Sequence, residues 1–431
     1  MFYTILEYRR GNMYDYYQCQ HRDIICVDLK SFYASVSCID HGMDPLTTKL
    51  AVVGNTKRQG SVVLASTPPL KAIGIKTGSR LYEIPHHNDI YITNPKMRKY
   101  LTISTQISQI ALQYVAPEDF HQYSIDEFFM DITDSYHLFA DSPYEMAKII
   151  QQKIFNTTQI KSTIGIGSNP LLAKVSMDIE AKHTKNGIAE WRYQDVPKKI
   201  WSIDNLIDFW GINSRTAKKL NKRGIQTIGD LAHYPHTYLK RDFGIVGVDL
   251  HLHANGIDES RISQKHQTKQ KGLGKSQILL RDYEFNEVKA VINEQVEDVF
   301  FRTRQQNLYP TTISIALGYA DGGGIRKQFT EKHGFKTTNA IIQTLWKFVS
   351  NVADTSEYYR TVSVNMKNFK SSHIKQLELF KSDMEQKTEA IDHALDDIRL
   401  KYGKDTVMRA TSLTDSGTLQ ARQGLMAGHQ A

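Results

Sequence analysis

The first 196 residues alternate between two hydrophobic patterns. Three short stretches, 23–29, 122–132 and 162–167, are apolar and rich in β-branched or aromatic residues, which is typical of buried strands. Residues 94–116 instead repeat apolar side chains at helical spacing, and further helices are predicted from Ser142 and from Asn169 to about Lys182. This alternation predicts an antiparallel sheet with helices on one face.

A smaller unit is predicted over residues 34–88, between the first two of these strands. Residues 50–54 and 61–65 have the composition of short strands, and the polar segment 55–60 favours a turn between them.

The pattern changes twice after residue 196. Residues 197–260 predict short helices. Residues 210–231 look like a helix-hairpin-helix unit, whose turn would expose backbone amides to a phosphate. An ordinary two-helix hairpin would produce the same spacing. Residues 272–368 predict the order strand, helix, strand, strand, helix, strand, with a hairpin turn at 321–324, which is the order of a split βαβ module.

Composition narrows the class of protein. At 431 residues the chain is too long for one ordinary core, so two to four domains are expected. No stretch approaches about 18 uncharged apolar residues, and the charged N-terminus lacks a signal-peptide core, so we expect neither a membrane span nor secretion. The three cysteines form no disulfide or metal-binding framework, which fits a reducing cytosol.

Positive charge is concentrated late in the chain. Residues 261–370 hold 17 Lys and Arg against 10 Asp and Glu, whereas the first 196 residues are nearly neutral. A basic module beside a neutral region suggests that the module holds a polyanion, although a solvated basic surface is a common alternative.

Carboxylates interrupt two of the predicted strands. Asp28 ends the first, and the adjacent Asp126 and Glu127 lie within 123–131. An unpaired buried carboxylate is costly, so either a salt bridge or a cation must compensate these groups. Three carboxylates could bind Mg²⁺, although strict alternation sends Asp126 and Glu127 to opposite faces unless the strand bends or ends there.

At these residues the sequence resembles the Y-family, or translesion, DNA polymerases. Residues 28–36 and 124–127 look like that family's two metal-site motifs, and the likeness covers about 21–380. It is strongest to the bacterial branch associated with damage-induced mutagenesis and the SOS response. The resemblance implies an α+β multidomain, right-hand polymerase with a palm, small fingers, a helix-hairpin-helix thumb and a βαββαβ little-finger domain.

The resemblance implies these domain bounds: an N-terminal arm at 1–20, the palm at 21–33 and 89–196, the fingers at 34–88, the thumb at 197–261, a linker at 262–271, the little finger at 272–370 and a tail at 371–431. Little of the tail is expected to be ordered: one helix is predicted around 391–400, and the last 20 residues are expected to be disordered.

The resemblance to the Y-family polymerases also implies roles for single residues. Asp28, Asp126 and Glu127, with the Leu29 carbonyl, would hold two Mg²⁺ ions, which Mn²⁺ could replace. Lys71 and Lys182 would bind the triphosphate, and Tyr33, with Phe32 packed beside it, would exclude ribonucleotides. Pro68-Pro69 departs from the family pattern next to Lys71. The expected DNA contacts are Gly211, Asn213, Arg215, Lys218 and Lys275, with Asn213 at a position often held by a second glycine.

Gln376-Leu377-Glu378-Leu379-Phe380 resembles the peptide by which bacterial replication factors bind the sliding clamp. Gln376 would anchor it, and Leu377, Leu379 and Phe380 would fill apolar pockets. The expected partners are therefore primer-template DNA, dNTP and the β sliding clamp, in the cytoplasm and at the nucleoid, with accessory or activating subunits left open.

Two other classes compete with a translesion polymerase. A non-catalytic factor that binds DNA and the clamp would displace other polymerases, but it would not need intact carboxylates. Another palm-type nucleotidyl transferase, such as a cyclase, would not need a helix-hairpin-helix or a basic module. No segment remains for a proofreading exonuclease.

Overall fold

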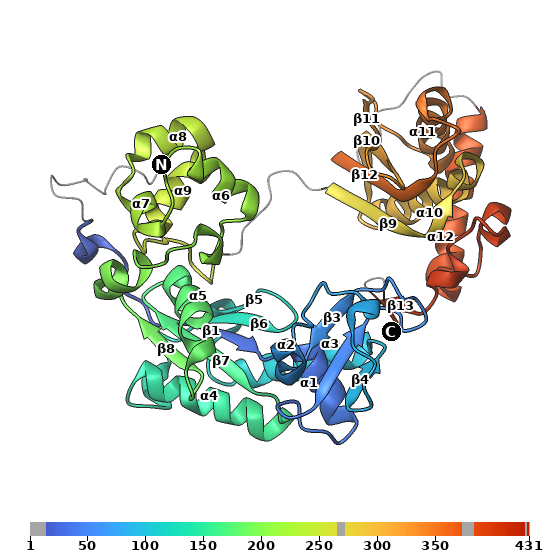
Figure 1. Ribbon diagram of the computed structural model, residues 1–431. Coiled ribbons are helices and arrows are strands. Elements are labelled where there is room, and N and C mark those ends of the chain that lie inside the picture. The colour runs from blue at the N-terminus through green and yellow to red at the C-terminus, as the bar shows by residue number, and fades with distance from the viewer. Residues whose placement is uncertain (1–13, 265–271, 373–382, 427–428, 431) are drawn as a thin grey trace. The chain divides into compact units, whose positions relative to one another are not determined.

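The computed structural model describes residues 14–264, 272–372, 383–426 and 429–430. The contacts of the chain divide it into two compact units, residues 1–266 with 426–431 and residues 267–425 (Figure 1). In the described part of the chain, no helix has the length and apolar character required to cross a membrane.

The sheet that carries the carboxylates has the strand order β5-β6-β1-β7-β8. Its strands, in chain order, are β1 (Ile24–Leu29), β5 (Phe120–Gln122), β6 (Glu127–Asp131), β7 (Ser162–Gly167) and β8 (Ile188–Trp191). β1 is antiparallel to both β6 and β7, whereas β7 and β8 are parallel.

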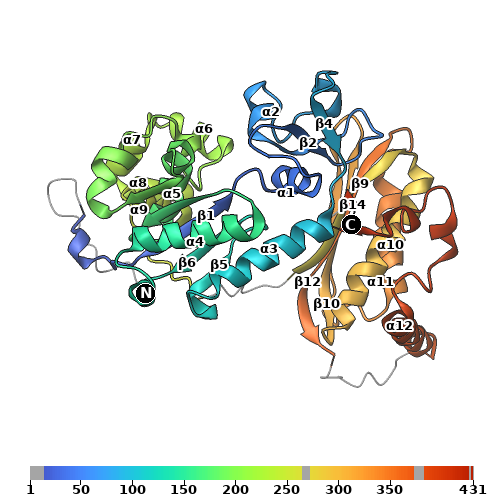
Figure 2. The ribbon, with the colours of Figure 1, turned by 90° about the horizontal axis from the view of Figure 1, so that it is seen from below.

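Helices cover both faces of this sheet (Figures 1 and 2). α3 (Met97–Ala111) and α4 (Pro143–Thr158) pack on one face, and α5 (Pro170–Ile179) packs on the other. The prediction of helices on one face is therefore wrong. The continuous apolar run Ile24–Val27 buries alternate side chains on opposite faces, which is the pattern of a central strand covered twice.

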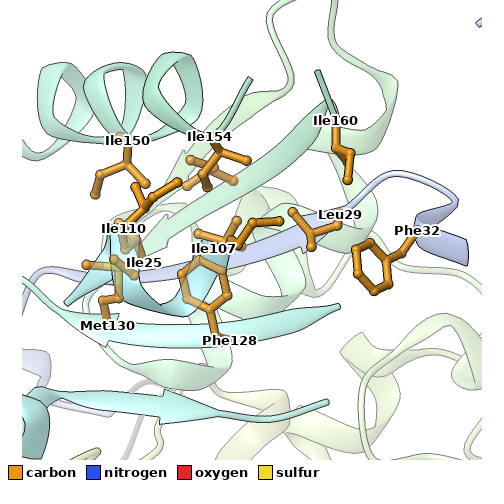
Figure 3. Packing of buried hydrophobic residues seen from close by; sticks show 14 of the residues in the cluster. Ile25, Leu29, Phe32, Ile107, Ile110, Phe128, Met130, Ile150, Ile154 and Ile160 are labelled. Carbon is orange, nitrogen blue, oxygen red and sulfur yellow. The ribbon is translucent and has the colours of Figure 1, made fainter. Parts of the chain in front are cut away.

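The larger core lies between the sheet and the α3–α4 layer. Ile25 and Leu29 of β1 pack with Phe128 and Met130 of β6, beneath isoleucines of the two helices (Figure 3). Those isoleucines are Ile107, Ile110, Ile150 and Ile154. Because odd-numbered residues of β1 face this core, Asp28 must face α5.

Residues 32–93 form a second, smaller sheet with the strand order β3-β2-β4. Its elements are α1 (Phe32–Asp40), β2 (Lys49–Val53), β3 (Val63–Ser66), α2 (Pro68–Ala72) and β4 (Ile90–Thr93). The two predicted strands are confirmed. The parallel strand β4 was missed because it is short and half-exposed, and it lies beyond the expected end of the fingers at residue 88.

Residues 193–257 form a helical cluster around Leu220, Leu231 and Leu239. Its helices are α6 (Ser214–Asn221), α7 (Ile228–His233), α8 (His236–Phe243) and α9 (Ile245–Ala254). Part of the expected N-terminal arm packs on this helical cluster. Tyr16 stacks on Tyr193 and donates a hydrogen bond to the Asn255 carbonyl.

A histidine buried in α9 gives this helical cluster a pH dependence. His251 is 1% exposed, and burial, together with neighbouring His236, lowers its pKa from 6.5 to about 4. A lowered pKa favours the neutral ring in the folded state, so stability is complete above pH 6.5 and is lost as the pH falls towards 4. We expect His251→Leu to remove up to about 3 kcal/mol of this acid destabilisation. Urea denaturation at pH 7.5 and pH 4.5 measures the loss; equal pH dependence in the wild type and the variant would contradict it.

The second unit confirms the predicted βαββαβ order. Its elements are β9 (Gly272–Tyr283), α10 (Phe285–Arg304), β10 (Leu308–Tyr319), β11 (Gly324–Thr330), α11 (Thr338–Val352) and β12 (Tyr359–Ser371). The strand order is β11-β10-β12-β9, and apolar side chains of the two helices share one core with the sheet.

The chain after residue 382 also packs on this unit. α12 (Asp383–Tyr402) turns polar side chains inwards: Asp396 accepts hydrogen bonds of 2.5 and 2.7 Å from Arg304 of α10, and Asp392 accepts one from the Thr338 N–H. Further on, the buried Thr418 donates to Glu294 of α10. The expected helix is confirmed, but the expectation of a disordered end is wrong for 412–426. Two short strands, β13 (Leu425–Met426) and β14 (His429–Gln430), pair with each other.

Candidate active site

The register of β1 and β6 brings two of the predicted carboxylates face to face. Asp28 is paired with Glu127 across the two strands. Asp126 precedes β6 in a bend, where its carbonyl accepts a hydrogen bond of 2.9 Å from the Leu29 N–H and its carboxylate accepts one from the Ser124 hydroxyl. The prediction of a strand over 123–126 is therefore wrong, and this bend removes the strict alternation that would separate Asp126 from Glu127.

A pocket of about 620 Å³ opens beside these strands. It gathers most of the residues that the sequence singled out: Asp28, Leu29, Phe32, Tyr33, Lys71, Asp126 and Lys182. Glu127 is 8% exposed and does not line the pocket.

Two lysines bring positive charge to this pocket. Lys71, on α2, donates a hydrogen bond of 2.9 Å to the Ser31 hydroxyl, and burial together with nearby Lys182 lowers its pKa. Lys182 lies 3.2 Å from Asp28 and 2.7 Å from Asp178. Burial opposes the charge on Lys182, but these two carboxylates raise its pKa overall. Both lysines line the pocket, where their ammonium groups would attract an anion.

Pro68 and Pro69 occupy the first turn of α2, where proline is well tolerated. Pro68 also lines the pocket, next to Lys71. The departure from the family pattern therefore leaves the helix that carries Lys71 intact.

The sequence analysis missed Lys174, which lies behind the pocket. Its ammonium is 2.8 Å from Glu127 and 3.0 Å from Asp178, and its side chain is 8% exposed. The spacing Lys174, Asp178, Lys182, four residues apart on a predicted helix, was a usable signal, since residues four apart share one face.

Two glycines of β7 allow α5 to approach the sheet. A Cβ on Gly165 would lie 2.0 Å from the Ala173 carbonyl oxygen, and one on Gly167 would lie 2.2 Å from the Ala173 nitrogen. Neither position could therefore carry a side chain without moving α5. The close approach lets Lys174 reach Glu127.

The donor set suits a hard divalent cation. Burial raises the pKa of Asp28, and the charges of Asp126 and Glu127 raise it further, against the opposing effect of Lys182. A cation that prefers oxygen ligands, such as Mg²⁺, would best relieve the electrostatic repulsion among these three carboxylates. Among the described residues, no group of three or more acidic, histidine or cysteine side chains already converges as metal ligands. Instead, Lys182 and Lys174 hold oxygens of Asp28 and Glu127.

Tyr33 forms an aromatic wall of the pocket. Its ring stacks on that of Tyr100 at 4.3 Å with an interplanar angle of 12°. Tyr100 is fully buried, and its hydroxyl lies 2.8 Å from the Ser37 hydroxyl. Phe32 is 2% exposed and contacts both tyrosines. This packing fixes the position of Tyr33.

The predicted thumb contacts lie at one turn and one helix start. Gly211 has φ +93°, which favours glycine, whereas Asn213 has φ −89° and caps α6 by accepting from the Thr216 N–H. Asn213 therefore stands at the often-glycine position without needing a positive φ, and it serves as an N-cap. Arg215 and Lys218 follow on α6 and are exposed.

Lys275 lies on the helix-covered side of its sheet. Its ammonium is 3.4 Å from Asp298 of α10, because odd-numbered residues of β9 face the helices. The structure therefore does not favour Lys275 as a DNA contact. The open face carries small polar residues, including Ser276, Ser363 and Asn365, with Arg326 on β11. Gln376, Leu377, Leu379 and Phe380 lie outside the described residues.

Family models match most of the chain. The impB/mucB/samB family matches residues 27–178, its C-terminal domain matches 270–379, and the IMS family HHH motif matches 193–225. The last match covers the start of the predicted thumb.

Curated relatives match over nearly the full length. A protein of Bacillus subtilis (strain 168), provisionally named UV-damage repair protein UvrX, is 44% identical over 97% of this chain and 100% of its own. DNA polymerase IV 2 of the same organism is 34% identical over 94% of this chain and 98% of its own. DNA polymerase IV of Pelotomaculum thermopropionicum is 32% identical over 93% and 98%.

Solved structures share the fold at lower identity. A Y-family DNA polymerase chimera of Dbh and Dpo4 has a TM-score of 0.65 at 19% identity, covering 80% of this chain and 98% of its own. An insertion ternary complex of Dbh DNA polymerase has a TM-score of 0.50 with the same coverage. With the family models and the relatives, these findings show that the chain belongs to the impB/mucB/samB family of Y-family translesion DNA polymerases and is a DNA-directed DNA polymerase.

Proposed function

We propose that this polymerase is a low-fidelity enzyme that copies damaged templates, using two divalent metal ions to join dNMP to a primer 3′-hydroxyl. The observation that carries the proposal is the single pocket that holds Asp28, Asp126, Tyr33, Lys71 and Lys182. Oxygen ligands, an aromatic wall and two ammonium groups are the parts that phosphoryl transfer to a deoxynucleotide requires.

The carboxylates of Asp28, Asp126 and Glu127 and the Leu29 carbonyl would hold the ions, with Mg²⁺ as the natural choice and Mn²⁺ as a substitute. When bound, such ions lower the pKa of the primer hydroxyl and neutralise charge on the triphosphate. Lys71 and Lys182 would bind the phosphates directly, as compact charges on flexible stems.

DNA would contact the exposed α6 turn, through Gly211, Arg215 and Lys218, and the open face of the β9–β12 sheet. Asn213 would support the turn as the α6 cap. Small polar side chains on the open sheet face suit backbone contacts that do not read sequence. Residues 376–380 would bind the β sliding clamp, in the cytoplasm at the nucleoid.

Primer extension by the full chain tests the proposal. With Mg²⁺ and dNTPs we expect synthesis on an undamaged template, insertion opposite an abasic site and extension of a mispaired primer without its excision. Synthesis that stops at every lesion, or prompt removal of the mispair, would contradict the proposed function while leaving the polymerase activity in place.

Tyr33 gives a separate prediction on sugar selection. We expect Tyr33→Ala to reduce discrimination against ribonucleotides by about 10–100-fold, because a 2′-hydroxyl pressed against a fixed wall costs about 1–3 kcal/mol. Tyr33→Phe keeps the ring stacked on Tyr100 and should behave as the wild type. Competing dCTP and rCTP in single-nucleotide insertion gives the ratio; unchanged discrimination in Tyr33→Ala would show that another group reads the sugar.

A further inference from the structure

Charged side chains behind the pocket form one continuous chain of alternating sign. It runs from Glu127 to Lys174 at 2.8 Å, from Lys174 to Asp178 at 3.0 Å, from Asp178 to Lys182 at 2.7 Å and from Lys182 to Asp28 at 3.2 Å. Its two ends, Glu127 and Asp28, are paired across β6 and β1. The chain thus links the proposed metal ligands to a proposed triphosphate lysine.

Three members of this chain, Glu127, Lys174 and Asp178, do not line the pocket. Lys182 and Asp28 border it, whereas Lys174 and Asp178 lie behind them on α5. Lys174 is buried, and a buried ammonium is costly unless carboxylates compensate it. Both of its partners are carboxylates, so its position is explained by what it holds.

The sheet is shaped to bring Lys174 to Glu127. Gly165 and Gly167 leave no room for a Cβ beneath α5, so that helix lies directly on β7. The Cys26 thiol of β1 donates to Oε1 of Glu127 at 3.4 Å, the same oxygen that Lys174 contacts. Glu127, which is 8% exposed, is therefore contacted from both β1 and α5.

We propose that Lys174 and Asp178 are positioning residues, through which Lys174 fixes the Glu127 carboxylate beside Asp28 and Asp178 anchors Lys182 at the rim of the pocket. This inference rests on the proposed function of the site. Groups behind a metal ligand commonly set its orientation, and their loss costs about 10–100-fold in metal affinity or activity. Lys182 needs the same support, because four rotatable bonds otherwise leave its ammonium unplaced.

Substitutions at the two residues should affect different measured quantities. Lys174→Gln removes the partner of Glu127, so we expect Mn²⁺ affinity without substrate, measured by electron paramagnetic resonance, to fall about 10–100-fold, with a matching loss in kcat. Asp178→Asn leaves Lys174 on Glu127 but removes the shorter of the two carboxylate contacts of Lys182, so that only Asp28 still holds its ammonium. We expect it to raise KM for dNTP at least about tenfold while kcat changes less.

Matched variants at exposed ion pairs serve as controls. Lys148→Gln breaks an exposed pair with Glu145, and Asp89→Asn breaks an exposed pair with Lys49; both should match the wild type. Thermal melting of every variant identifies any that fail to fold. If Lys174→Gln proves unfolded, Lys174→Met, which keeps the length of the side chain, replaces it in the Mn²⁺ titration.

The possible outcomes distinguish a failure of this inference from a failure of the proposed function on which it rests. Unchanged Mn²⁺ binding in folded Lys174→Gln would overturn the assignment of Lys174, and so would tighter binding, which would show that Lys174 competes with the metal. An unchanged KM in Asp178→Asn would overturn the anchoring of Lys182. If the wild type and Glu127→Gln bind Mn²⁺ equally poorly, the proposed metal site itself fails.

Discussion

We expect the Asp126→Ala/Glu127→Ala variant to bind primed duplex DNA like the wild type and to extend no primer. Both carboxylates belong to the proposed metal site, whereas the exposed residues of α6 and the open sheet face lie on other elements. Metal ions that stabilise transition-state charge are worth several kcal/mol, so the loss in rate should be at least about 10³-fold.

Single-turnover extension and fluorescence anisotropy on the same duplex measure the two properties. Asp141→Ala/Glu145→Ala is the matched control, because it removes two exposed carboxylates from the same unit without touching the pocket. Residual extension within tenfold of the wild type would place the metal ligands elsewhere. Loss of duplex binding together with synthesis would mean that the double variant had lost its fold.

The second large effect should come from Arg304. Its guanidinium makes two hydrogen bonds to Asp396, and the side chains of Arg304, Asp396 and Asp392 are all at most 10% exposed. Arg304→Ala leaves both carboxylates buried without this partner, and breaking a buried pair costs about 3–5 kcal/mol. We expect a lower urea midpoint for the second unit and faster proteolysis within α12.

An exposed pair of the same chemistry is the control. Arg360 lies 2.9 Å from Asp282, with both side chains more than 40% exposed, so Arg360→Ala should cost less than about 1 kcal/mol. Equal urea midpoints for Arg304→Ala and Arg360→Ala would show that the polar contacts of α12 add no stability.

The sequence predicted those features that follow from local pattern. Apolar strands and helical periods marked β1, β7 and the whole βαββαβ order, and carboxylates in an apolar setting marked Asp28, Asp126 and Glu127. It could not place groups whose role depends on a distant neighbour. The spacing of Lys174, Asp178 and Lys182 marks one helix face, but nothing local shows that Lys174 meets Glu127, because the packing of α5 on β7 brings the two together. The φ of Asn213 likewise cannot be read from its neighbours in the sequence.

In α12 the helix was predicted correctly, but most of the apolar residues that predicted it do not face the domain. Ile391 and Ile398 gave the helical period, yet they are exposed, while Asp392, Asp396 and Arg399 face the domain. Helical spacing identifies a helix but not the face that it buries, because paired charges can replace apolar contacts at an interface.

The docking of α12 has a consequence for tethering. β12 ends at Ser371 and α12 begins at Asp383 in the same unit, so the proposed clamp peptide at 376–380 belongs to a segment attached at both ends. About eleven residues span at most about 40 Å, and two attachments shorten the distance that the peptide can reach. A clamp bound to residues 376–380, as proposed, would therefore stay close to the second unit. Attachment at both ends would raise the effective concentration of the second unit at the clamp, compared with a peptide at the end of a free tail.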